Sequence, residues 1–127
     1  MQRFRNILVA IDGDHPPQGV LVRAGRLARQ NGASLKLIAV VEHLPWYARL
    51  VLPSAEELQA LLVRARAETL ERLAGPLRQA GAAVSTGVLQ GRRSLEIVRE
   101  VLRGGYDLLI VVSSAAPSRP AAAPSTT

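Results

Sequence analysis

An unbroken run of five aliphatic residues near the start of the chain, Ile7–Ile11, constrains the fold more than any other feature. A strand with this composition has no polar face, so both of its faces must be covered. Asp12-Gly13-Asp14 follows at once and predicts a turn. A second run of the same kind, Leu108–Val112, lies about one hundred residues later. Strands buried on both faces are typical of parallel sheets, so we predict an α/β fold.

The segments between these two runs alternate as a parallel sheet requires. Leu35–Val41 is predicted as the second strand and Ala83–Leu89 as a weaker third. Apolar residues at steps of three and four predict helices that end near Gly32, Gly81 and Gly104. The second strand begins about two dozen residues after the first ends, a spacing that fits a right-handed βαβ crossover.

The longest predicted helix begins after Ser54, an expected N-cap, and we expect Gly75-Pro76 to kink or break it because proline cannot donate to the carbonyl four residues back. Before it, Glu42–Pro53 has no hydrophobic period and is predicted to be a loop. The apolar stripe of the helix is expected to contain Leu58, Leu61, Leu62, Ala65, Leu70, Leu73 and Leu77.

Composition and length predict one domain with an aliphatic core. The chain has 127 residues, 48% of them apolar and only 3% aromatic. Absence of cysteine removes disulfides and thiolate chemistry, and no segment resembles a signal peptide or membrane span, so we expect a cytoplasmic protein with no membrane partner. From residue 113 onward Ser, Ala, Pro, Arg and Thr dominate without any period, which predicts a domain over residues 1–112 and a disordered tail over 113–127.

The net charge of +6 raises the question of nucleic-acid binding. The arginines are spread along the chain, mostly at helical spacing opposite apolar residues, and they have no aromatic residues interleaved among them. This pattern indicates solvated helix faces, and we expect no nucleic-acid partner.

Candidate chemistry is confined to the turn after the first strand. Asp12 is placed at the carboxyl end of a strand, where open α/β sheets bind ligands, but it could equally cap the turn into the next helix. Asp14 and His15 lie beside it, and His43, after the second strand, is a remote candidate for a fourth ligand of a weakly supported metal site. No catalytic triad and no Walker A or G-x-G-x-x-G motif is present, so we predict no catalytic residues and no bound metal.

Four segments in register, 6–13, 27–33, 35–41 and 106–114, together resemble the universal stress protein family. The resemblance implies a three-layer, open parallel sheet of the adenine-nucleotide α-hydrolase-like, Rossmann-like kind. The family has five strands in the order 3-2-1-4-5, is usually dimeric, and has stress-response or signalling roles without established catalysis. Its ATP-binding branch holds the nucleoside with residues that match Asp12 and Val40 here. We add Gly13, next to Asp12, to the candidate nucleotide-binding residues.

The chain departs from that branch at the phosphate loop. The family pattern places a G-x-x-G motif after the fourth strand and Gly-Ser or Gly-Thr about nine residues later. This sequence has Ser113 and Ala116 in place of the two glycines, and no glycine follows. The fourth helix and fifth strand of the family are also missing, which predicts that the strand over 108–112 is an edge with one uncovered face.

Two hypotheses about function follow from the resemblance. In the first, the chain is a non-catalytic regulatory module that acts as a homodimer or docks on a protein partner, with weak or absent ATP binding. In the second, it binds an adenine nucleotide, ATP with Mg²⁺, through Asp12, Gly13 and Val40, with Ser113 and Ser114 as a reduced phosphate site. Loss of the glycines favours the first, because their backbone N–H groups would approach the phosphates most closely.

Overall fold

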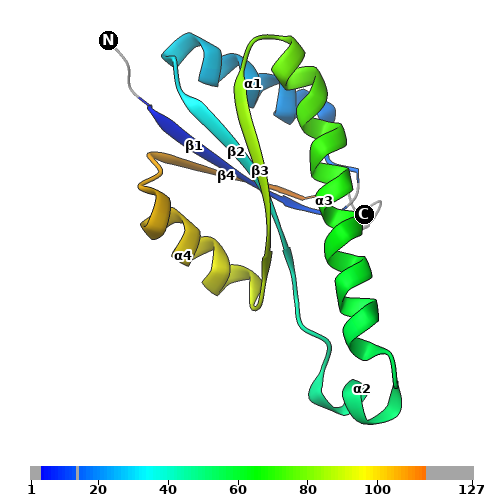
Figure 1. The fold of residues 1–127 in the computed structure, drawn as a ribbon. Helices are drawn as coiled ribbons and strands as arrows, with labels where there is room; N and C mark the ends of the chain where they lie inside the picture. Colours follow the sequence, from blue (N-terminus) through cyan, green and yellow to red (C-terminus); the bar gives the residue numbers. More distant parts are fainter. Residues whose placement is uncertain (1–3, 14, 114–127) are drawn as a thin grey trace, which may run out of the picture.

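The computed structural model describes residues 4–13 and 15–113. Its strands form one parallel sheet in the order β3-β2-β1-β4 (Figure 1). The strands are β1 (Asn6–Asp12), β2 (Ser34–Val41), β3 (Ala83–Gln90) and β4 (Leu108–Ser113). The helices are α1 (Gln18–Asn31), α2 (Trp46–Val51), α3 (Ala55–Gln79) and α4 (Arg93–Gly104). The predicted fold class and strand order are confirmed.

Alternate residues of each central strand contribute to two separate cores. Ile7, Val9 and Ile11 of β1 pack against α1 and α3, whereas Leu8 and Ala10 face α4. All five side chains are buried, because helices cover the sheet on both faces. The unbroken aliphatic run therefore marks a central strand, as predicted.

Chain direction across the sheet reverses between β3 and β4. The path β1, α1, β2, α3, β3 moves outward on one side of β1, and α4 then returns the chain to β4 on the other side (Figure 1). β1 is consequently paired with both β2 and β4. Such a switch point leaves a crevice at the carboxyl ends of the strands, which is where ligands bind in this class of fold.

A glycine ends α1, as the sequence indicates. Gly32 has φ of 62°, and the backbone N–H of Ala33 donates to the carbonyl of Ala28 at 2.8 Å. A left-handed residue with this hydrogen bond closes a helix and returns the chain to the sheet, and glycine adopts that conformation without strain.

The predicted loop over Glu42–Pro53 was wrong in part, because it contains the six-residue helix α2. Pro45 occupies the N-cap position, and the N–H of Leu52 donates to the carbonyl of Ala48 at 2.7 Å. Proline suits the start of a helix because no intrahelical donor is needed there. One helical turn is too short to give a hydrophobic period, so the sequence pattern could not reveal it.

Pro76 does not break α3, so that part of the prediction was wrong. The helix continues to Gln79, with Ala74 and Leu77 buried on either side of the proline. Packing of these side chains on the sheet offsets the missing hydrogen bond. Ser54 does occupy the N-cap position, but its side chain makes no capping hydrogen bond, and its carbonyl accepts from the N–H of Leu58.

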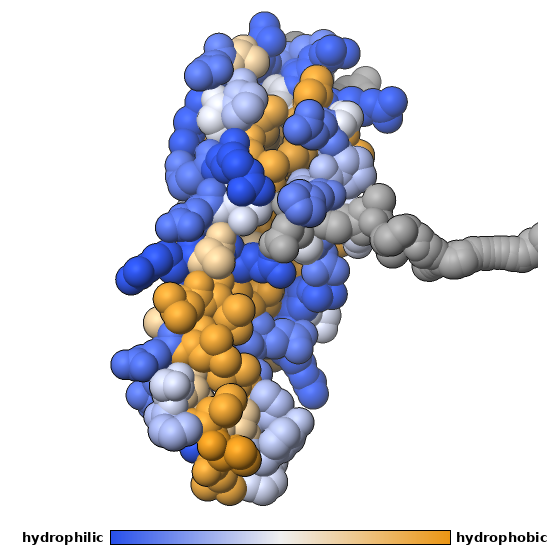
Figure 2. Space-filling view, turned by 90° about the vertical axis from the view of Figure 1, so that its right-hand side faces the viewer, coloured by the Kyte–Doolittle hydropathy of each residue, from blue (hydrophilic) through white to orange (hydrophobic). Residues whose placement is uncertain are grey.

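Half of the predicted stripe of α3 is exposed. Leu70 and Leu77 pack on the sheet, whereas Leu58, Leu61 and Leu62 are 39%, 57% and 40% exposed. Figure 1 shows why: the first half of α3 extends beyond the end of the sheet together with α2. We call α2 and residues 55–65 of α3 the arm. A continuous apolar surface covers the lower part of the molecule in Figure 2, where the arm lies.

A buried ion pair, which the sequence pattern does not predict, fixes α4 to the sheet. Glu100 is 3% exposed, and its carboxylate accepts hydrogen bonds from Lys36 Nζ of β2 at 2.8 Å and from Arg103 at 3.1 Å.

Within the described residues, no helix has the length and apolar character needed to cross a membrane.

Candidate functional site

Three of the predicted site residues meet at the carboxyl edge of the sheet. Asp12 ends β1, and Ser113 of β4 is its partner in the strand register. Val40 precedes the last residue of β2, on the other side of β1, and lines the same small cavity as Asp12. Ser113 is exposed, and Ser114 lies outside the described residues. The topology therefore brings Asp12, Val40 and Ser113 to one edge.

Asp12 is paired with a residue that was not predicted to be in the site. Arg93, the first residue of α4, donates from Nη2 to Oδ1 of Asp12 at 3.1 Å. Asp12 does not cap α1, because Pro17 occupies that N-cap position and no side chain bonds to it. Of the two roles considered for Asp12, helix capping is excluded by this geometry.

The space beside this ion pair is very small. The cavity that Asp12, Val40 and Arg93 share has a volume of about 10 Å³, and Ala10, Ile11, Ile38, Ile97 and Val111 complete its lining. On this measure a cavity of about 10–15 Å³ holds one water molecule, and ligand pockets have volumes of several hundred. Adenosine therefore does not fit between Asp12 and Val40 while Arg93 holds this position.

Gly13 has a structural role at the exit from β1. Its φ of 98° lies in the left-handed region, where a side chain would be strained. The turn that carries the chain out of the crevice therefore requires glycine, whether or not a ligand is present.

The weakly supported metal site gains no support from the described residues. Among residues 4–13 and 15–113, no three His, Cys, Asp or Glu side chains are grouped so that they could hold a metal ion, and Asp14 is not described. His43 and Glu42 instead line a separate open depression of about 190 Å³ with Gly91 and Arg92. The described residues therefore do not form a site that could hold Mg²⁺ without a bound nucleotide.

Arg93 is the residue of the candidate site that the sequence did not indicate. It follows β3 in a Gly91-Arg92-Arg93 segment, which the sequence pattern assigned to a turn before the helix. The available signal was its position, because the segment after any strand of a parallel sheet reaches the same edge as Asp12. Without the strand order, however, nothing indicated that this arginine would contact β1.

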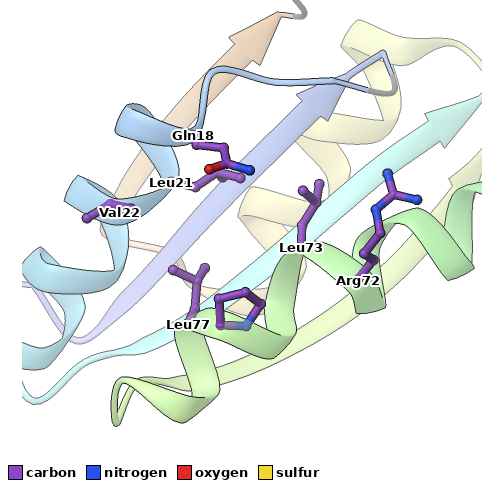
Figure 3. A pocket seen from close by; sticks show the side chains of 7 residues that line it. Gln18, Leu21, Val22, Arg72, Leu73 and Leu77 are labelled. Carbon is purple, nitrogen blue, oxygen red and sulfur yellow. The ribbon is translucent and has the colours of Figure 1, made fainter.

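A larger groove lies on the opposite face of the sheet, between α1 and α3. It has a volume of about 270 Å³, and Figure 3 shows the side chains that line it. Leu21 and Leu77 contribute apolar surface from the two helices, and Gln18 and Arg72 are its polar members. None of the predicted site residues contributes to this groove.

Solved structures with the same fold agree with this architecture. UspA, a universal stress protein from Lactobacillus plantarum, superposes with a TM-score of 0.78 at 18% identity over 94% of this chain and 86% of that chain. Protein Rv1636 from Mycobacterium tuberculosis H37Rv gives a TM-score of 0.64 at 18% identity over 93% and 78%. A universal stress protein in complex with cAMP gives 0.51 at 19% identity over 84% and 70%. Identities this low establish the fold alone.

The sequence comparisons give the family. Comparison with curated protein sequences gives no match. The pattern that describes the universal stress protein family matches residues 3–126. Since this match covers nearly the whole chain, it confirms the resemblance carried by the strand segments: the chain belongs to the universal stress protein family.

Proposed function

We propose that this chain is a non-catalytic stress-response module of the cytoplasm, which acts by dimerising or by docking on another protein and binds ATP weakly or not at all. One observation carries the proposal. The place where the nucleoside would bind, between Asp12 and Val40, is reduced to about 10 Å³, and Arg93 occupies the carboxylate. A ligand would have to displace an ion pair before making its own contact.

The end of β4 also lacks the features of a phosphate site. Ser113 stands where the family pattern has the first glycine of its phosphate loop. A Cβ there keeps the backbone N–H groups away from a close approach to phosphate oxygens. This supports weak or absent binding of a triphosphate.

Exposed apolar surface supports the docking part of the proposal. Leu109 and Val111 of β4 pair with Leu8 and Ala10, whose side chains face α4, so all four point to the same side of the sheet. Leu109 is 39% and Val111 59% exposed, and β4 is the edge strand of the described sheet. The arm adds a larger apolar surface. Surfaces of this kind commonly mark sites of protein association.

The second candidate function is binding of an adenine nucleotide. The solved universal stress protein in complex with cAMP supports it, as does the meeting of Asp12 and Val40 at one edge. The Asp12–Arg93 pair is about half exposed, and such a pair stabilises a structure by about 1 kcal/mol at most. A ligand that makes good contacts elsewhere could therefore open the Asp12–Arg93 pair at little cost in free energy. In that case Mg²⁺ would arrive with ATP.

Calorimetric titration with ATP and Mg²⁺ separates the two candidates. The proposal predicts no saturable heat at ligand concentrations below about 1 mM. Saturable micromolar binding that is lost in Asp12→Ala would overturn it in favour of the nucleotide-binding candidate. Asp12→Ala is the matched control because, among the described lining residues, it removes the carboxylate and leaves the apolar lining intact.

A further inference from the structure

The arm exposes more large apolar side chains than any other part of the described chain. Seven of them are between 39% and 77% exposed: Trp46, Tyr47, Leu50, Val51, Leu58, Leu61 and Leu62. Figure 2 shows a continuous hydrophobic surface over the lower half of the molecule, where the arm lies. Trp46 and Tyr47 are in edge-to-face contact, with ring centroids 6.0 Å apart. Aromatic side chains of this kind commonly act as anchors in protein interfaces.

Within α3, the exposed apolar residues form a stripe on a different face from the buried one. Leu58, Leu61, Leu62 and Ala65 follow the i, i+3, i+4, i+7 spacing of one helix face. Leu70 is nine residues after Leu61, which at 3.6 residues per turn places it on the other side of the helix, where it packs on the sheet. The fold therefore uses one face of α3 and leaves the second without a partner among the described residues.

Two opposite charges border this stripe along the same flank. Glu57 and Arg64 are seven residues apart, so they lie nearly above one another, two turns apart. Both are exposed, and neither has an ion-pair partner among the described residues. If Leu58 and Leu61 are taken as the a and d positions of a heptad, both charged residues are g positions, where partner choice and orientation are set.

We propose that the arm is a self-complementary dimerisation surface, on which two copies of the chain pack their α3 helices antiparallel about a two-fold axis beside Leu61. This deepens the proposed function and rests on its dimerisation. In an antiparallel pair, g positions face g positions. An axis between residues 60 and 61 places Glu57 of one protomer against Arg64 of its partner, and by symmetry the reverse pair forms too.

The positions of these charges select a second copy in this orientation. The axis that pairs Glu57 with Arg64 also passes through the middle of the apolar stripe, so charge and apolar contacts require the same arrangement. A parallel pair would instead place each g residue against the position five residues later, which is Leu62 for Glu57 and Thr69 for Arg64. Only the antiparallel arrangement satisfies both charges.

Sedimentation velocity across a concentration series tests the surface. The wild-type chain is expected to dimerise, and Leu61→Arg to weaken the dimer at least a hundredfold, since it places two like charges at the axis. Leu102→Arg is the matched control, because Leu102 is 77% exposed but belongs to α4. Circular dichroism checks that both variants remain folded. A dimer that survives Leu61→Arg but dissociates in Leu102→Arg would overturn the inference and move the interface to the α4 and β4 face.

A charge exchange tests the orientation. Glu57→Arg alone and Arg64→Glu alone each create two like-charge contacts and should weaken the dimer roughly tenfold. An equimolar mixture of the two variants regains two opposite-charge contacts and should form a heterodimer about as tight as the wild-type homodimer. A mixture no tighter than the separate variants contradicts the antiparallel arrangement.

Failure of this inference can be told apart from failure of the proposed function. A dimer that is insensitive to every arm substitution would contradict the arm as the interface but would agree with dimerisation itself. A wild-type chain that remains monomeric up to about 1 mM would contradict both the arm interface and the dimerisation part of the proposed function. Nucleotide binding is measured separately and is unaffected by either result.

Discussion

Nη2 of Arg93 lies 3.1 Å from Oδ1 of Asp12, which joins the first residue of α4 to the last residue of β1. The pair spans the crevice where the order of the strands reverses. Because the carboxylate bonds to the chain's own arginine, the residue best placed to bind a nucleoside already has a partner. The two side chains are 49% and 41% exposed, so the pair can open.

Arg93→Ala should increase the affinity for adenosine by up to about fivefold, since a half-exposed ion pair costs about 1 kcal/mol at most to open. Chemical shifts followed during an adenosine titration report this affinity even at millimolar concentrations. Arg92→Ala is the matched control, because Arg92 lies next in sequence and makes no ion pair among the described residues. A fall in affinity in Arg93→Ala would show instead that the guanidinium helps to hold the ligand.

Lys36→Met should destabilise the fold by about 3 kcal/mol, because it leaves the buried Glu100 carboxylate with Arg103 alone. Glu100→Gln should cost less, about 1 kcal/mol, because the Lys36 side chain is 27% exposed and can reach water. Urea unfolding measures both free energies. Equal losses would mean that burial of the carboxylate does not dominate this pair.

Acidification should weaken the attachment of β1 to β4 through Asp107. Its carboxylate accepts hydrogen bonds from the backbone N–H groups of Arg5 and Asn6, at 2.6 and 3.1 Å, and these bonds lower the pKa of Asp107. A lowered pKa in the folded state gives stability that is present above the unfolded pKa, about 4, and is lost as the pH falls through the folded value. Asp107→Asn should therefore show a shallower loss of stability below pH 4 in thermal unfolding, and a slope equal to that of the wild type would contradict this role.

Pro76→Ala should stabilise the chain by about 1–2 kcal/mol. Alanine restores a donor to the carbonyl of Arg72 inside α3 and relieves the steric conflict of the ring, which together stabilise the helix by about 3 kcal/mol. The unfolded chain becomes more flexible without the proline, which offsets about 1 kcal/mol of this gain. Pro53→Ala, outside any helix, is the control and should not stabilise. Destabilisation by Pro76→Ala in thermal unfolding would show that the ring's packing contributes more than the lost hydrogen bond.

The layered fold was predictable because its central strands carry their own signal. Ile7–Ile11 is apolar at every position, which only a doubly covered strand requires, and Leu108–Val112 repeats it. The parallel direction of the strands followed from the spacing of the helices between them, whereas the order of the strands was implied by the family resemblance. The length of α3 was harder to predict, since tertiary packing of Ala74 and Leu77 decides whether the chain continues through Pro76.

The site was predictable only in part. Asp12 and Val40 meet because both lie at the carboxyl ends of neighbouring strands, a relationship that the family resemblance implied. Arg93 closes the site because α4 returns across the sheet, which depends on tertiary geometry. The arm escaped prediction for another reason: a helical stripe shows that a face is apolar, but it does not show whether the sheet is long enough to cover it. Leu61 and Leu70 belong to the same pattern and have opposite environments.

The most direct test of the account is an amide-resolved magnetic resonance titration of the whole chain with ATP and Mg²⁺, read at Gly13, Val40 and Ser113. Because Arg93 holds Asp12 and the site is small, we expect no saturable shift at these three amides below about 1 mM nucleotide. Saturable shifts at Gly13 and Val40 with a micromolar midpoint would contradict it, and would show that this member of the universal stress protein family binds ATP.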